Sequence, residues 1–106
     1  MPKYLIQASY TREGIQGLMG DSASGRRADV LASVKALGGK VEAFYYAFGS
    51  DDVIIILGLP DNVTAAAVGL TTAGTGTVRV RTTPLLTVEE VDKALEVNMR
   101  YRAPGQ

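Results

Sequence analysis

The sequence predicts an α+β fold in which two β-α-β units share one antiparallel sheet and a further helix closes the chain. Strand-like and helix-like stretches alternate twice along the 106 residues, and a polar turn joins the two middle strands. The length fits a single domain, which buries roughly 60–70% of its unfolded surface. Cysteine is absent, so the fold must rest on a packed core rather than on disulfides.

The first strand and the first helix are separated by a glycine-rich stretch. Residues 3–10 mix β-prone apolar side chains with polar ones, which predicts a strand. Residues 11–20 contain three glycines and predict at best a loose helical turn. The Asp21-Ser22 pair can cap a helix that ends at Gly38-Gly39. Its side chains at helical spacing are Ala23, Arg27, Val30, Leu31, Val34 and Leu37.

The middle of the chain predicts a β-hairpin. Residues 41–48 are rich in aromatic side chains, residues 49–52 form a turn, and residues 53–57 are almost wholly apolar. Pro60 ends the second strand of the hairpin because proline cannot donate to a ladder.

After the hairpin, the chain forms a helix and a strand. Asp61-Asn62 caps the helix, whose expected apolar face comprises Val63, Ala66, Ala67 and Leu70. Residues 77–83 alternate valine with arginine, which predicts a strand with one polar face. Pro84 is expected to stop this strand.

The chain closes with a helix and a tail. Thr87 and Glu90 match the T-x-x-E pattern of a capping box, which marks the start of the helix. We therefore place the domain at residues 1–97 and a C-terminal tail at residues 98–106.

This element order is that of ferredoxin-like folds, a four-stranded antiparallel sheet with helices on one face. The strand at residues 53–57 is apolar on both alternating faces, whereas a strand exposed on one side should alternate. Burying such side chains at an interface is worth roughly 1.5–3 kcal/mol each. We therefore expect a second copy of the chain to cover the open face, in a homodimer or a higher homo-oligomer.

Composition argues against several classes of function. The chain has no histidine and no cysteine, so we expect neither a transition metal nor another cofactor. Its 11 basic and 11 acidic residues cancel, which argues against nucleic acid and anionic membranes as partners. No apolar run approaches the roughly 20 residues of a membrane span. The apolar stretch at residues 4–6 is too short for a signal peptide, so a cytoplasmic protein is expected.

A series of short motifs follows along nearly the whole chain: Glu13-Gly14-Ile15, Leu37-Gly38-Gly39-Lys40-Val41, residues 44–49, Asp52-Val53-Ile54, Leu59-Pro60-Asp61, and Val78-Arg79 before Thr87. In this order the motifs resemble the GYD domain family. The family is named for a Gly-Tyr-Asp turn between the hairpin strands. Here the glycine and the aspartate match, but Asp51 stands where the tyrosine is expected, so any role of that tyrosine is lost or moved. The resemblance implies a ferredoxin-like, oligomeric fold and no established activity.

Arg79 and Arg81 are the first candidates for a ligand site. They lie two apart, so they share one face of the last strand. If the alternating valines face the helices, both arginines face the open side and could bind the carboxylate or phosphate of a small anionic organic ligand. Gln7 and Ser9 of the first strand share this face and join them as candidates. The alternative is an intersubunit salt bridge or a charged edge strand that resists aggregation.

Asp52 and Tyr45 are the remaining candidates. The Asp51-Asp52 pair could serve a hard metal or acid–base chemistry, but aspartates are also typical of hairpin turns. Adjacent strand residues point to opposite faces, which argues against one shared site, and we favour Asp52 as the functional member. Tyr45 points to the open face and could line a pocket or an interface.

Two functions remain after a nucleic-acid binder is rejected. RNA recognition motifs share this element order but stack bases on aromatic residues of the central strands, and residues 51–57 have none. The sequence favours a homo-oligomeric small-molecule-binding or regulatory module. The alternative is a cofactor-free enzyme acting on a small organic substrate in a pocket between sheet faces, with Asp52 or a tyrosine as base.

Overall fold

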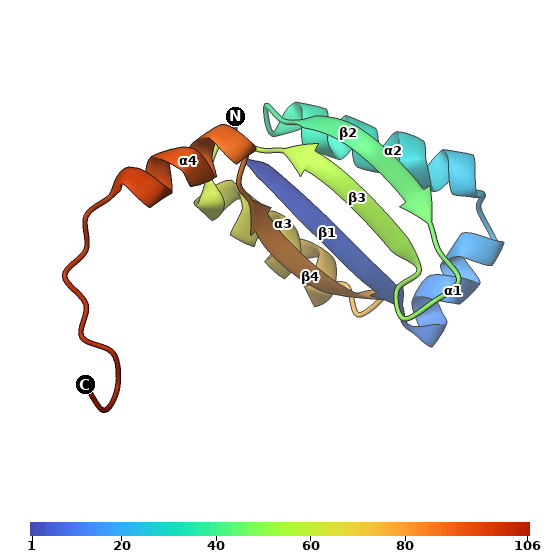
Figure 1. The fold of residues 1–106 in the computed structure, drawn as a ribbon. Helices are drawn as coiled ribbons and strands as arrows, with labels where there is room; N and C mark the ends of the chain where they lie inside the picture. The colour runs from blue at the N-terminus through green and yellow to red at the C-terminus, as the bar shows by residue number, and fades with distance from the viewer.

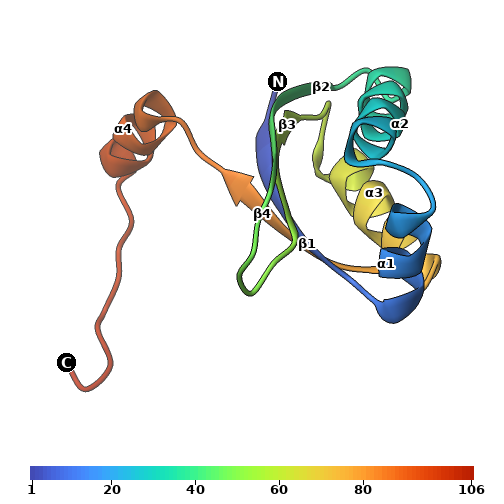
Figure 2. The same ribbon diagram turned by 90° about the vertical axis from the view of Figure 1, so that its right-hand side faces the viewer.

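The computed structural model describes residues 1–106 and contains one four-stranded sheet (Figure 1). The strands are β1 (Lys3–Tyr10), β2 (Lys40–Tyr46), β3 (Val53–Gly58) and β4 (Val78–Leu85). Their order is β2-β3-β1-β4, and every neighbouring pair is antiparallel. The helices are α1 (Arg12–Met19), α2 (Ala23–Ala36), α3 (Asn62–Gly74) and α4 (Val88–Glu96). Figure 2 shows α1, α2 and α3 on one side of the sheet, which confirms the predicted α+β ferredoxin-like fold.

The core lies between the sheet and these three helices. Because side chains alternate along a strand, β1 and β3 turn one set of residues toward the helices. The nine buried core residues are Tyr4, Ile6, Ala8, Val34, Val53, Ile55, Leu57, Leu59 and Ala65. The hydroxyl of Tyr4 donates to Oδ1 of Asn62 at 2.6 Å, which ties the start of α3 to a central strand.

α1 is a regular helix where the sequence predicted only a loose turn. Oγ1 of Thr11 accepts from the backbone N–H of Gly14 and donates to the Gly76 carbonyl at 2.7 Å. A Cβ on Gly14 would lie 2.0 Å from the Thr77 carbonyl oxygen. This glycine therefore allows α1 to approach the backbone just before β4, and the prediction of no more than a loose turn was wrong.

β4 continues through Pro84 to Leu85, so the predicted stop at this proline was wrong. β4 pairs with β1 alone and forms one edge of the sheet, where Pro84 lies opposite Tyr4. An edge strand accepts proline because one row of its backbone N–H groups has no neighbouring strand to donate to.

α3 turns a different face to the sheet from the predicted one. Val63 and Leu70 are 80% and 76% exposed, whereas Ala65 is buried. Gly69 faces Thr82 of β4, whose Oγ1 lies 3.7 Å from the position of a Cβ on the glycine. Small side chains on this face let α3 lie close to β4, and close packing rather than side-chain size selects the buried face.

α4 and the C-terminal segment lie away from the body, on the side of the sheet opposite to the other helices (Figure 2). The predicted capping box is confirmed, because Glu90 N–H donates to Thr87 Oγ1 at 3.0 Å and Thr87 N–H donates to Glu90 Oε1 at 2.9 Å. Residues 98–106 form no helix or strand. None of the helices combines the length and the apolar character that crossing a membrane requires.

Candidate functional site

The open face of the sheet brings together four of the predicted site residues. In the register of β1 and β4, Gln7 lies opposite Arg81 and Ser9 lies opposite Arg79. The ferredoxin-like element order implies that the first and last strands are neighbours, and this register confirms it. Polar groups from two strands and the hairpin turn form one cluster next to an edge of the sheet, which we call the open-face cluster: Gln7, Ser9, Asp51, Arg79 and Arg81.

Asp51 supplies the carboxylate of this cluster. Its Oδ2 accepts from Nη2 of Arg81 at 2.7 Å and from Nε2 of Gln7 at 3.3 Å. Oγ of Ser9 donates to the Ser50 carbonyl at 3.1 Å and reaches Oδ1 of Asp51 at 3.4 Å. The side chain of Asp51 is 13% exposed and that of Arg81 is 65% exposed. Arg81 thus has an internal anion, whereas Arg79 forms no ion pair in the chain.

Asp52 lies at a different place from Asp51. Its Oδ2 accepts from the backbone N–H of Tyr10 at 2.8 Å, and its own N–H donates to the Ala8 carbonyl at 2.9 Å. These bonds join the hairpin to the end of β1. The carboxylate beside the arginines is therefore that of Asp51, although the sequence favoured Asp52 as the functional member of the pair.

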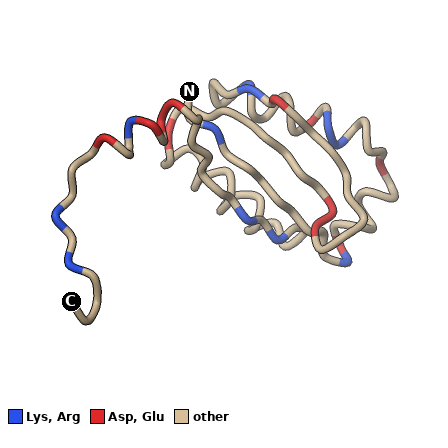
Figure 3. The backbone as a smooth tube through the Cα atoms, in the orientation of Figure 1, with Lys and Arg blue, Asp and Glu red and all other residues tan.

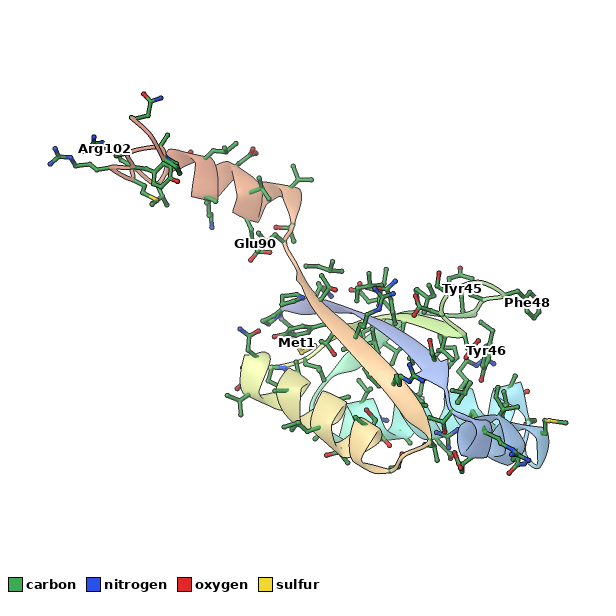
Figure 4. All side chains as sticks on the ribbon, turned by 90° about the horizontal axis from the view of Figure 1, so that it is seen from below. Met1, Tyr45, Tyr46, Phe48, Glu90 and Arg102 are labelled. Carbon is green, nitrogen blue, oxygen red and sulfur yellow. The ribbon has the colours of Figure 1, made fainter.

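Tyr45 lies on the open face but apart from the cluster. It is paired with Ile54, which is paired with Gln7, so Tyr45 shares a row with Gln7 and Arg81 across the four strands. The intervening Ile54 separates it from the polar side chains. Figure 4 shows Tyr45 on the side of the sheet away from the helices, with Tyr46 on the other side. Ligand binding by these open-face residues stays a prediction.

A cavity of about 550 Å³ lies on the other face of the sheet. α2 packs on β2 and α3 packs on β4, so the two helices cover opposite edges of the sheet. Between them the central strands carry a floor of apolar side chains: Ile6, Ala8, Val53, Ile55 and Leu57. We call this space the helix-side cavity. Sequence reasoning missed it, because the gap depends on how far apart the two helices settle.

Polar groups gather at the α1 end of the helix-side cavity. The end of β1, α1, the connection after α1 and the first half of α2 contribute to its lining Tyr10, Glu13, Asp21, Arg26 and Asp29. Nη1 of Arg26 lies 3.3 Å from Oδ2 of Asp29.

The surroundings of Tyr10 shift the pKa of its hydroxyl. Burial, and then the neighbouring Tyr46, raise the pKa of Tyr10 above its ordinary value of 10.0, and Arg26 opposes them. The hydroxyl of Tyr46 itself donates to the Ala23 carbonyl at 3.2 Å. Tyr10 therefore keeps its proton at neutral pH and can donate one hydrogen bond to a molecule in the cavity.

The two faces offer different chemistry. The helix-side cavity has an apolar floor with hydroxyl, carboxylate and guanidinium groups at one end, an arrangement that holds and orients a small organic molecule. The open-face cluster offers one unpaired guanidinium beside a satisfied ion pair. No three aspartate or glutamate side chains converge anywhere in the chain as a metal site would require.

A model of the GYD domain family matches residues 4–95 of the chain. No curated protein and no solved structure matches it. The matched segment runs from β1 into α4, and it includes all of the sheet except Lys3, together with the helix-side cavity and the open-face cluster. The resemblance inferred from the short motifs is thus confirmed, and the chain belongs to the GYD domain family.

Proposed function

We propose that this chain is a small-molecule-binding module that works as a homo-oligomer and holds its ligand in the helix-side cavity. The observation that supports this proposal is a cavity of about 550 Å³ with an apolar floor and a polar end. Ligand pockets of folded proteins span roughly 300–1,000 Å³ and share this division between apolar walls and few polar groups. The cavity has the size and the lining for one small organic molecule.

The charges of the lining indicate which ligands fit. The lining contains three carboxylates, those of Glu13, Asp21 and Asp29. Its one basic side chain is Arg26, which is already paired with Asp29. An anion at this end would meet repulsion, whereas a neutral polar group or an amine would not. The ligand we propose therefore has an apolar body and a neutral or cationic polar end that accepts from, or donates to, the Tyr10 hydroxyl.

A cofactor-free enzyme is the second candidate. The observation that favours it is the Tyr10 hydroxyl, a proton donor that lies with carboxylates at the polar end of the cavity. A protonated tyrosine beside carboxylates could act as a general acid toward a bound substrate. Binding requires fewer precisely placed groups than catalysis, so the binding module ranks first.

A substitution at Gly17 tests the cavity directly. Gly17 lines the cavity, and no atom lies within 4 Å of the position of a Cβ, so Gly17→Phe adds bulk without a clash at the Cβ. We expect the wild type to bind the neutral fluorescent probe N-phenyl-1-naphthylamine, and the variant to lose at least tenfold in affinity while keeping its circular dichroism spectrum.

Gly74→Phe is the matched control for this test. Gly74 is also helical and also has open space around the position of a Cβ, but it does not line the cavity. Its variant should bind the probe like the wild type. Equal binding by the Gly17 variant would contradict the proposal, and native mass spectrometry of the purified wild type would show whether a molecule accompanies the chain.

A further inference from the structure

α4 is an amphipathic helix without a partner in its own chain. Its apolar side chains Val88, Val91 and Leu95 recur at helical spacing and are 75%, 42% and 78% exposed. A helix of nine residues is marginal alone in water, because most helical stability in proteins comes from packing an apolar face. The exposed stripe of α4 therefore indicates a surface that covers it.

The open face of the sheet carries an apolar patch that the helices leave uncovered. Leu5, Ile54 and Ile56 lie side by side on β1 and β3, and all three are only half-buried. Ala43 and Tyr45 extend this patch onto β2. Because side chains alternate along a strand and the intervening residues are buried in the core, these side chains point to the other face of the sheet. α4 lies on that side of the sheet (Figure 2).

The charges of the two surfaces are complementary. Helical geometry places Glu89, Asp92 and Glu96 along one flank of the α4 stripe. Arg79 and Arg81 lie along β4, at one side of the apolar patch, and Arg79 forms no ion pair in its own chain. Figure 3 shows the acidic residues of α4 and the basic residues of β4 at separate places within one chain. An apolar stripe with an acidic flank thus matches an apolar patch with a basic flank.

From these observations we propose that α4 of one copy docks on the open sheet face of a second copy, and that the exchange is reciprocal. Only Leu86 and Thr87 separate β4 from α4, and the helix projects away from its own sheet (Figure 2). α4 can therefore reach the sheet of a second copy without a reversal of the chain at these two residues, whereas docking on its own sheet would require one. Reciprocal exchange gives a twofold, self-complementary interface. The inference specifies the homo-oligomer of the proposed function and does not depend on the cavity ligand.

Because the chain has no cysteine, any disulfide in a variant must join cysteines that were introduced. Two variants are prepared, one with Ile54→Cys and one with Val91→Cys, and they are mixed under oxidising conditions. We expect a disulfide-linked pair that contains one copy of each variant. The control replaces Ile54→Cys with Met19→Cys, which is 79% exposed but lies on α1 at the other side of the sheet, and it should not cross-link.

The double variant Ile54→Cys/Val91→Cys separates exchange between copies from docking within one chain. A cross-linked dimer supports the proposal, and an oxidised monomer with no free thiol overturns it. The absence of any cross-link in a chain that is still dimeric would also overturn it, while leaving the homo-oligomer intact.

Light scattering completes the test. We expect the wild type to have twice the 11.2 kDa mass of one chain, and Leu95→Asp to be monomeric at the same concentration. Val63→Asp is the matched control, because Val63 is 80% exposed on α3 and should leave the dimer unchanged. A monomeric wild type would overturn both this inference and the proposed oligomer, and a dimer that survives Leu95→Asp would overturn the inference alone.

Discussion

Asp51 and Asp52 are neighbours in the chain, yet their carboxylates act at different places. Asp51 accepts from Arg81 and Gln7 on the open face, whereas Asp52 accepts from the backbone of Tyr10 at the end of β1. The alternation of side chains predicted this separation. Alternation could not predict which aspartate pairs with Arg81, because the path of the hairpin turn decides which carboxylate lies beside the arginine.

Tyr10 gives a pH-dependent test of the cavity lining. Its raised pKa means that ionisation is less favourable in the folded chain than in the unfolded one. The stability from neutral Tyr10 is full below the unfolded value of 10.0 and is lost as the pH rises through the higher folded value. Phenylalanine cannot ionise. We therefore expect the urea midpoint of Tyr10→Phe to fall less steeply than that of the wild type as the pH rises above 10.0.

The exposed Tyr45 provides the control for this measurement. Tyr45→Phe keeps Tyr10, and its urea midpoint should follow the wild-type curve from neutral to alkaline pH. Identical curves for the wild type and Tyr10→Phe would mean that the Tyr10 hydroxyl ionises as easily in the folded chain as in the unfolded chain.

At the scale of elements, α1 shows two glycines with opposite roles. Gly14 lies against the backbone of Thr77, whereas nothing lies within 4 Å of the position of a Cβ on Gly17. We expect Gly14→Ala to lower the free energy of unfolding by about 1–3 kcal/mol, because the helix must shift away from β4. Gly17→Ala should raise it by about 0.5–1 kcal/mol, the usual gain for alanine over glycine inside a helix.

Urea unfolding of the two alanine variants measures both effects on one helix. A loss of stability in both would indicate that the whole of α1 packs tightly. A gain in both would indicate that α1 lies farther from Thr77 than the structure places it.

At the scale of the whole molecule, local sequence patterns predicted the elements and their pairing. Alternation indicated the strands, the caps at Asp61 and Thr87 marked helix starts, and the element order indicated the pairing of β1 with β4. These patterns could not predict the helix-side cavity, because that space depends on how α2 and α3 settle over opposite sheet edges. Nor could they predict the buried face of α3, where small residues pack and larger ones stay exposed.

The partner of Arg79 on the open face bears on how two copies of the chain assemble. An unpaired guanidinium can be matched by a free anionic ligand, as the sequence indicated, or by the acidic flank of α4 from a second copy. On the proposed exchange, Arg79→Glu replaces attraction by repulsion and should raise the dimer dissociation constant about tenfold. Arg27→Glu makes the same charge change on α2, and it should have no effect on the dimer.

Two further measurements decide which anion Arg79 meets. If α4 supplies it, Asp92→Arg combined with Arg79→Glu should recover part of the lost affinity, because the reversed charges attract again. In that case inorganic phosphate at millimolar concentration should leave the melting temperature of the wild type unchanged. If a free anion is the partner, phosphate should stabilise the wild type by mass action but not Arg79→Ala, and the charge reversal on α4 should recover nothing. The second pattern would move the ligand from the helix-side cavity to the open face, because the unpaired arginine would then be part of a binding site rather than of an interface.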